Sequence, residues 1–213
     1  MFTFKAHWTP HYIVSRILQQ IDSIINPNAP WFPRSARKWL DKTIDETMTG
    51  IEWGSGRSTL WLSRRVGFLT SIEDNNEWYR YVKTKLDSCK IQNVRYQFVK
   101  NERKTEPQTP DSYPYVTRPD IKNETLDFAI VDGSYREYCL IRALDFVKPG
   151  GLIILDDSNC YLPTDSVVPV KLSSPANRTW ERIVELTSDW KIHVFYDGVK
   201  ELKVWQKPIK NNQ

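Results

Sequence analysis

From about residue 50 onward, short apolar runs alternate with amphipathic stretches, and this alternation constrains the fold more than any other feature. Each run has the length of one strand, and the stretches between carry apolar residues at helical spacing. Such alternation is typical of a parallel sheet covered by helices on both faces. We predict strands ending at Trp53 and spanning Phe68–Glu73, Val94–Val99, Leu126–Val131 and Leu152–Leu155, with helices over Ser58–Val66, from Asn75, over Arg136–Val147 and from Ser174-Pro175.

The end of the chain departs from this parallel pattern. Ile192–Tyr196 and Leu202–Trp205 read as strands, and Asp197-Gly198 lies between them. Asp-Gly between two alternating runs predicts a β-hairpin. A hairpin makes the last strand antiparallel, whereas a dinucleotide-binding domain would add another parallel strand after a crossover helix.

Two helices are predicted before the first strand. Thr9-Pro10 has the form of a helix start, and the second helix is expected from Ser35 to about Glu46. We expect residues 1–47 to form a helical extension that covers one edge of the sheet, residues 48–207 the main domain, and 208–213 a tail. The first helix carries one apolar face, made of Ile13, Val14, Ile17, Leu18, Ile21, Ile24 and Ile25. Between the helices, Trp31 and Phe32 lie among prolines; we expect them to pack, with a role in roofing the active site as the alternative.

The first strand leads into a glycine turn. Glu52 closes the strand, and Gly54 and Gly56 follow it before a helix begins. Glycine allows a sharp turn and close approach of a ligand, and the helix start offers free backbone N–H groups. Glu73 closes the next strand about twenty residues later, where a carboxylate can accept two hydrogen bonds from a ribose diol. The pattern predicts a nucleoside site, and Thr59 in place of the third glycine of a GxGxxG motif disfavours NAD.

With Val131-Asp132-Gly133 and the run Pro149–Asp157, this series resembles the class I S-adenosylmethionine (SAM) dependent methyltransferases, and the EWGSGRST loop looks like a small subgroup of them. The resemblance implies a Rossmann-like α/β sheet of seven strands, with the last strand antiparallel and inserted between the fifth and sixth. It implies SAM as cofactor, Glu52 near the methionine amine, and Asp132 near the methionine or the methyl group. Asp74 could instead cap the helix that is expected from Asn75. The expected cofactor-binding residues are Glu52, Gly54, Ser55, Gly56, Ser58, Thr59, Glu73, Asp74 and Asp132.

A more distant resemblance is to catechol O-methyltransferase, which places Mg²⁺ between acidic residues after the fourth and fifth strands. Asp132, Asp156 and Asp157 fall at matching places, and oxygen ligands suit Mg²⁺. Asp157 stands where Asn is usual, and Tyr135 stands where a lysine base is expected. The alternative is that these carboxylates bind substrate or backbone amides without metal. Candidate catalytic residues are Asp132, Asp157 and Tyr135, and the three histidines, His7, His11 and His193, are expected to be structural.

Two long predicted loops, 100–124 and 157–174, flank the cleft of this topology. Loops of this length in a compact domain are often functional. They carry the four residues that we expect to contact the acceptor, namely Tyr113, Tyr115, Asn159 and Tyr161. These features together predict O-methylation of a small hydroxylated molecule.

Two other functions are compatible with the same pattern. One is a non-catalytic SAM-, nucleoside- or partner-binding domain, which would bind cofactor without turnover. The other is another transferase on this fold, such as an aminopropyltransferase, which would need an acidic pocket for a polyamine; no such cluster stands out in the loops.

Composition excludes some partners and leaves others open. The net charge is +4, and the Lys200, Lys203, Lys207 and Lys210 series is the only candidate basic stripe, so we do not expect nucleic acid as a partner. No apolar run is long enough for a membrane span. Three cysteines without CxxC spacing suggest a reducing, cytoplasmic setting, with Cys89 and Cys139 as core thiols. A homodimer is left open.

Overall fold

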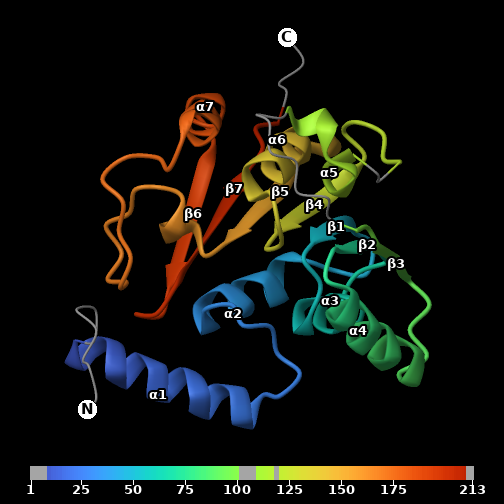
Figure 1. Ribbon diagram of the computed structural model, residues 1–213, viewed down its shortest axis with the longest axis horizontal. Helices are drawn as coiled ribbons and strands as arrows, with labels where there is room; N and C mark the ends of the chain where they lie inside the picture. The colour runs from blue at the N-terminus through green and yellow to red at the C-terminus, as the bar shows by residue number, and fades with distance from the viewer. Residues whose placement is uncertain (1–8, 101–108, 118–119, 210–213) are drawn as a thin grey trace.

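The computed structural model describes residues 9–100, 109–117 and 120–209. Seven strands form one sheet in the order β3-β2-β1-β4-β5-β7-β6 (Figure 1). The pairs among β1 to β5 are parallel, whereas β7 runs antiparallel to both β5 and β6. This order confirms the predicted Rossmann-like sheet with its terminal hairpin. The strands are β1 Thr49–Trp53, β2 Phe68–Glu73, β3 Val94–Phe98, β4 Leu126–Val131, β5 Val147–Asp156, β6 Lys191–Tyr196 and β7 Glu201–Gln206.

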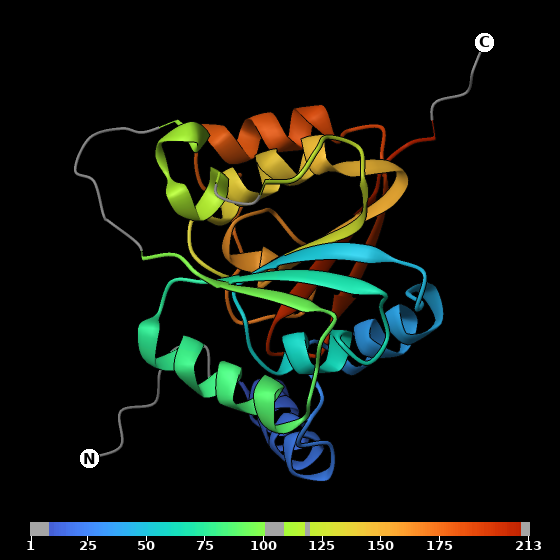
Figure 2. The same cartoon turned by 90° about the vertical axis from the view of Figure 1, so that its right-hand side faces the viewer.

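Helices cover both faces of the sheet, as Figure 2 shows. On one side, α6 and α7 pack over a core that contains Trp53, Leu140 and Trp180. On the other side, α2 and α3 enclose Leu40, Leu62 and Phe128. The helices are α1 Pro10–Ile25, α2 Arg34–Thr43, α3 Arg57–Leu62, α4 Asn76–Ser88, α5 Pro114–Thr117, α6 Arg136–Phe146 and α7 Arg178–Leu186, with short 3-10 turns η1 Pro110–Ser112 and η2 Ser158–Cys160.

Several element boundaries differ from the prediction. β5 begins at Val147, so the Pro149-Gly150-Gly151 stretch continues the strand that was expected to start at Leu152. A Cβ atom on Gly151 would lie 2.6 Å from the carbonyl oxygen of Asp127, so only glycine lets β5 pass this close to β4. Helix α7 begins at Arg178 because the Asn177 side chain, and not Ser174, caps it. α3 ends at Leu62, four residues before the predicted end.

The first helix is capped as predicted but does not bury its apolar face. The Thr9 side chain accepts a hydrogen bond from the backbone of Tyr12, and Pro10 opens the helix. Ser15 is the only residue of α1 that is buried. The predicted cover of the sheet by both N-terminal helices is therefore correct for α2, which buries Ala36 and Leu40, and wrong for the apolar face of α1.

Two smaller expectations also have an outcome. Cys139 is a buried free thiol, but Cys89 is exposed at the end of α4, so the prediction of a core thiol there is wrong. His193 packs its ring 4.8 Å from that of Trp39, while His7 lies outside the described residues. Within the described part of the chain, no helix combines the length and apolar character that a membrane span requires.

Candidate functional site

The loops after β1 and β4 meet back to back at two glycines. Gly54 has a φ of +92°, and a Cβ atom there would lie 2.5 Å from the backbone nitrogen of Gly133. A Cβ atom on Gly133 would in turn lie 2.0 Å from the hydroxyl oxygen of Tyr115. Neither position therefore tolerates a side chain without displacement of the other loop. This contact joins the two halves of the candidate site at the carboxyl ends of the neighbouring parallel strands β1 and β4.

Gly56 differs from Gly54, because a Cβ atom there would make only ordinary van der Waals contacts. Its backbone is extended, and the nearest atoms to a Cβ there belong to Trp78 at 3.8 Å. Its N–H donates to the Thr59 hydroxyl at 2.9 Å, and the Trp78 indole N–H donates to the Ser55 carbonyl at 2.7 Å. The loop is thus held in place by these hydrogen bonds, and Gly56 itself is buried.

Glu73 at the end of β2 is almost fully buried and organises this loop. One carboxylate oxygen accepts from the backbone N–H of Ser55 at 3.0 Å and from its hydroxyl at 2.7 Å. The other accepts from the backbone N–H groups of Asp74 and Asn75 at 3.1 and 2.9 Å. The Ser55 hydroxyl also lies 2.7 Å from that of Tyr96. All four donors are neutral, so one of them could be exchanged for a ligand hydroxyl without breaking an ion pair.

Glu52 lies beneath the same loop, completely buried. Its Oε2 accepts from the hydroxyls of Thr59 at 2.6 Å and Ser71 at 2.8 Å. Its Oε1 has no hydrogen-bond partner among the residues that the structure describes. Burial raises the pKa of Glu52 to about 7, although hydrogen bonds from Ser58, Thr59 and Ser71 oppose the rise. Glu52 thus anchors α3 from below.

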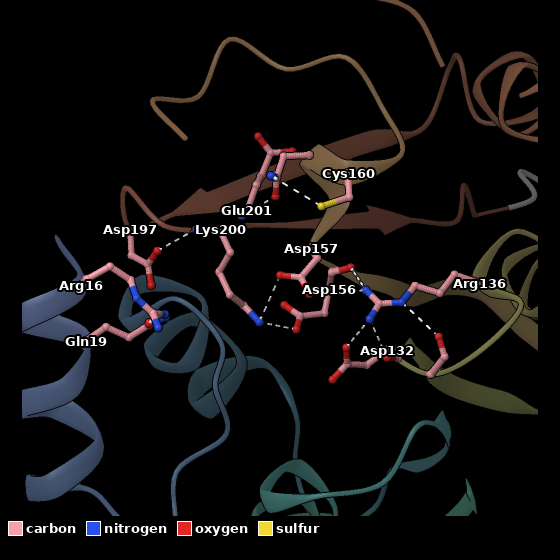
Figure 3. Close-up of polar contacts among 12 residues, drawn as sticks. Arg16, Gln19, Asp132, Arg136, Asp156, Asp157, Cys160, Asp197, Lys200 and Glu201 are labelled. Carbon is pink, nitrogen blue, oxygen red and sulfur yellow. Dashed lines mark hydrogen bonds and ion pairs between the residues drawn. The ribbon is translucent and has the colours of Figure 1, made fainter. Parts of the chain in front are cut away.

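Three aspartates meet on the other side of the glycine contact (Figure 3). Carboxylate oxygens of Asp132, Asp156 and Asp157 lie within 4.8 Å of one another at the ends of β4 and β5. Two cations lie between them. Arg136 donates to Asp132 Oδ1 at 2.9 Å and lies 3.7 Å from Asp157, and Lys200 pairs with Asp156 and lies 3.4 Å from Asp157.

The Arg136 guanidinium is also fixed by backbone oxygens, which makes it a permanent part of the cluster. It donates to the carbonyls of Asp132 at 2.7 Å, Gly133 at 3.1 Å and Asp156 at 2.6 Å. Burial raises the pKa of Asp132 to about 6, even though the charges of Arg136 and Lys200 oppose the rise. Burial and the Asp132 charge raise the pKa of Asp156 well above its usual range. For Lys200, burial opposes the charged form, but Asp156 and Asp157 outweigh it and raise the pKa.

The donor set of this cluster does not fit a resident Mg²⁺. The sequence correctly brings three carboxylates together, yet Arg136 and Lys200 already lie where a divalent cation would have to bind. Mg²⁺ would have to compete with two protein cations that are themselves held by several contacts. Each of the three carboxylates has a protein cation within 4.0 Å, and Oδ1 of Asp156 is a buried oxygen without a hydrogen-bond partner in the described structure.

A cavity of about 330 Å³ opens beside this cluster. Asp157 and Lys200 line it from the sheet, Arg16 and Gln19 line it from α1, and Trp31 lines it from the linker between α1 and α2. Trp31 is 66 % exposed, whereas Phe32 is buried in the core. Packing is therefore the right interpretation for Phe32, and Trp31 lies at the candidate site.

The remaining predicted residues are placed mainly by packing. Tyr113 and Tyr115 are buried in the core, and the Tyr115 carbonyl accepts from the Trp53 indole at 3.1 Å. Asn159 is also buried, and its side chain binds the backbone of Val170 and Glu201. Tyr161 is half-buried, stacked on Trp180 and 5.5 Å below the Arg136 guanidinium. Tyr135 takes a left-handed conformation (φ 50°) at the start of α6 and stacks on Tyr113. Ser58 and Thr59 are buried, and Asp74 is half-buried beside Glu73.

Four residues of the site were missed by sequence reasoning. Arg136 follows Asp132 by four positions at a helix start, a spacing that a search for ion pairs would have flagged. Trp78 and Tyr96 hold Ser55 from α4 and β3, and Lys200 reaches the cluster from the hairpin turn. These three have no local signal. Lys203 and Lys207 are also held, by Glu201 and by backbone carbonyls, and Lys210 lies outside the described residues, so the suspected basic stripe is not a free surface.

No protein-family model and no curated protein matches the sequence. Solved structures do match the fold. A protein from Corynebacterium glutamicum aligns with a TM-score of 0.58 at 14% identity, over 94% of this chain and 92% of that chain. A SAM-dependent methyltransferase from Aquifex aeolicus gives 0.50 at 17% identity, over 90% and 97%. An rRNA methylase from Streptococcus thermophilus gives 0.53 at 10% identity, over 82% and 95%. With the strand order, these likenesses show that the chain has the Rossmann-like fold of methyltransferases.

Proposed function

We propose that this protein is a SAM-dependent methyltransferase that methylates an oxygen of a small hydroxylated molecule. The observation that carries the proposal is the Glu73 carboxylate, which holds a side-chain hydroxyl at 2.7 Å in the glycine loop after β1. A ribose hydroxyl offers the same donor as the Ser55 hydroxyl and can replace it. The methyltransferase fold and the SAM dependence of the Aquifex aeolicus protein support SAM as the nucleoside.

In this proposal the cofactor lies along the glycine loop. Glu73 binds the ribose, Asp74 and Gly56 flank the nucleoside, and the Gly54 turn passes beneath the methionine part. Glu52 acts through Thr59 and Ser58, which keep the helix start in place, and its unpartnered Oε1 is the acceptor for the methionine amine when the loop opens. Asp132 lies at the methionine end, on the far side of the contact between Gly54 and Gly133.

The cavity beside the aspartate cluster suits the acceptor. About 330 Å³ fits a small molecule and is at the lower end of typical ligand pockets. The exposed Trp31 offers an aromatic face on which a flat ring can stack. Arg16 and Lys200 place two positive charges on the wall of the cavity. A polyamine acceptor is disfavoured by those cations, which argues against aminopropyl transfer.

SAM, when bound, supplies an activated methyl group, so the protein has to orient the acceptor and take its proton. Asp157 is the carboxylate of the cluster that lines the cavity, and we assign it as the base. It accepts the proton of the acceptor hydroxyl as the oxygen attacks. Lys200 and Arg136 orient that carboxylate, and Lys200 is held protonated by Asp156 and Asp157, so it is not a base. Tyr135 is stacked on Tyr113, and we give it a packing role.

Calorimetry with SAM and S-adenosylhomocysteine tests the cofactor. We expect micromolar binding that weakens about 100-fold in Glu73→Gln, because the amide loses one acceptor and the charge. The control is Glu77→Gln, an exposed glutamate on α4, which should bind as the wild type does. No binding by the wild type would overturn the proposal.

A screen of phenols and alcohols for S-adenosylhomocysteine release tests the reaction. We expect turnover of a small hydroxylated aromatic, reduced at least 100-fold in Asp157→Asn and unchanged in the exposed control Asp165→Asn. Equal turnover by both variants would remove Asp157 from the proton transfer.

One observation favours a second function, a non-catalytic SAM-binding domain. The carboxylates of Glu73 and of the aspartate cluster are already bound by donors and cations of the protein. Such a domain would bind SAM in calorimetry and release no S-adenosylhomocysteine with any acceptor.

A further inference from the structure

Helix α1 lies at the edge of the molecule, and its polar face, not its apolar face, is turned toward the rest of the protein. At 100° per residue, seven aliphatic residues occupy one face of the helix and Ser15, Gln19, Asp22 and Ser23 the opposite face. The polar face is the one that contacts the rest of the protein. Asp22 pairs with Arg37, Ser23 accepts from Arg57 at 2.9 Å, and Ser15 is buried against the turn at Gly198. The apolar face therefore points away from the protein, at the periphery seen in Figure 1.

The outward face is large and contains no charge. Its seven aliphatic residues are between 38 % and 77 % exposed, and they are Ile13, Val14, Ile17, Leu18, Ile21, Ile24 and Ile25. Together they equal about four fully exposed aliphatic residues, on the order of 700 Å² per chain, close to the roughly 800 Å² that each partner buries in a standard interface. An aliphatic patch of this size is more than a monomer normally exposes.

The spacing along this face matches a second copy of the same helix. Val14, Leu18, Ile21 and Ile25 are separated by four, three and four residues, the spacing of a helix-pairing seam. That spacing reads the same in both directions. When two copies run antiparallel about a two-fold axis, Val14 lies opposite Ile25 of the other copy and Leu18 opposite Ile21.

The charges near the face do not oppose a partner helix. The groove of about 360 Å³ beside α1 lies on its inward side, where Asp22 and Ser23 line it together with Arg37. Of the charged residues on α1, Asp22 is paired with Arg37, and Arg16 binds Gln19 on the polar side. Self-pairing thus brings no like charges together. A membrane-surface helix would normally carry several lysines or arginines beside its apolar face, and α1 has one arginine.

We propose that the protein forms a two-fold symmetric dimer in which the apolar faces of two α1 helices pack antiparallel. The polar face of the same helix lines the cavity that contains Asp157 and Lys200, so the pairing also holds α1 over that cavity. The inference does not rest on the proposed methyltransferase activity, because its test uses no cofactor.

Sedimentation equilibrium of the full chain tests the dimer. We expect twice the chain mass at micromolar concentration for the wild type, and the monomer mass for Leu18→Glu/Ile21→Glu with an unchanged circular dichroism spectrum. Val184→Glu, at a comparably exposed aliphatic residue of α7, is the matched control and should remain dimeric. A wild type that is monomeric at 200 μM, or a double variant that stays dimeric, would overturn the proposal, as would a monomer that instead sediments with phosphatidylcholine vesicles.

Cysteine crosslinking tests the orientation. In a Cys89→Ser/Cys160→Ser background, which removes the exposed thiols, Val14→Cys chains are mixed with Ile25→Cys chains. Antiparallel packing predicts disulfides between the two kinds of chain several-fold above those within each kind, because the two copies of residue 14 are about 16 Å apart along the axis. Crosslinks within each kind in excess would contradict the antiparallel arrangement.

Discussion

The two halves of the candidate site hold their carboxylates by different means. On the β1–β2 side, the partners of Glu52 and Glu73 are hydroxyls and backbone N–H groups, and only Oε1 of Glu52 lacks a partner among the described residues. On the β4–β5 side, Asp132, Asp156 and Asp157 are satisfied by the charges of Arg136 and Lys200. Neutral donors can be exchanged for those of a ligand at small cost, whereas an ion pair in a partly buried cluster has to be kept intact. The first half is thus suited to bind, and the second to hold one carboxylate at a fixed place.

Removal of a cation from the second half should have the largest effect. Arg136→Met leaves Asp132 without its ion-pair partner and three backbone carbonyls without their donor. We expect a loss of about 4 kcal/mol in the free energy of unfolding, measured by urea denaturation. Arg142→Met on the same helix removes only exposed ion pairs and should cost below about 1 kcal/mol. Equal losses in the two variants would mean that the cluster is not held by charge.

The next largest effect should be a dependence of the free energy of unfolding on pH, part of which originates at Glu52 in the first half. The folded-state pKa of Glu52 is about 7 and its ordinary value is 4.5, so the folded state binds this proton more tightly than the unfolded state. The resulting stability is complete below about pH 4.5 and is lost as the pH rises through about 7. The loss corresponds to about 3 kcal/mol.

Thermal unfolding between pH 4 and 8 measures this effect. The stability of the wild type should fall as the pH rises. Glu52→Gln should remove the part of this slope that comes from Glu52 and leave the part that comes from Asp132 and Asp156, whose pKa values are also raised. The exposed Glu181→Gln should keep the wild-type slope. A Glu52→Gln protein with an unchanged slope would contradict the assignment.

Replacement of Lys200, the second cation of the aspartate cluster, should allow the second half to bind a metal ion. Lys200→Met leaves three carboxylates with one cation, and we expect 10 mM Ca²⁺ or Mg²⁺ to raise its melting temperature by a few degrees, about 1 kcal/mol of binding. The wild type and Lys203→Met, whose lysine pairs with Glu201 at 3.9 Å, should not respond. A wild type stabilised to the same extent would show that metal already binds beside Lys200.

The smallest effect is expected where a neutral donor is removed. Ser55→Ala takes away the hydroxyl that we expect a ribose hydroxyl to replace, while the backbone N–H of Ser55 stays on Glu73. SAM binding by calorimetry should change by less than about 3-fold, in contrast to the large loss in Glu73→Gln. A loss as large as that of Glu73→Gln would mean that Ser55 itself binds the cofactor.

The same contrast explains what could be predicted from sequence. The limits of β2 and β4, the hairpin and the carboxylates at the strand ends follow from local patterns, and the donors to Glu73 lie within twenty residues of it. Lys200 lies 44 residues from Asp156, and only the insertion of β7 beside β5 brings them together. The outward face of α1 was missed because a periodic apolar pattern indicates that a face is covered, without saying by what.

The contact between Gly54 and Gly133 has a consequence for how the two halves can change. Neither residue can gain an atom without pushing the other, so the loop after β1 and the loop after β4 share one boundary. A shift of one loop by a few tenths of an ångström is passed to the other through backbone atoms, with no side chain between them to absorb it. The two loops therefore move together, so the position of a ligand beside one loop sets the space that is available beside the other.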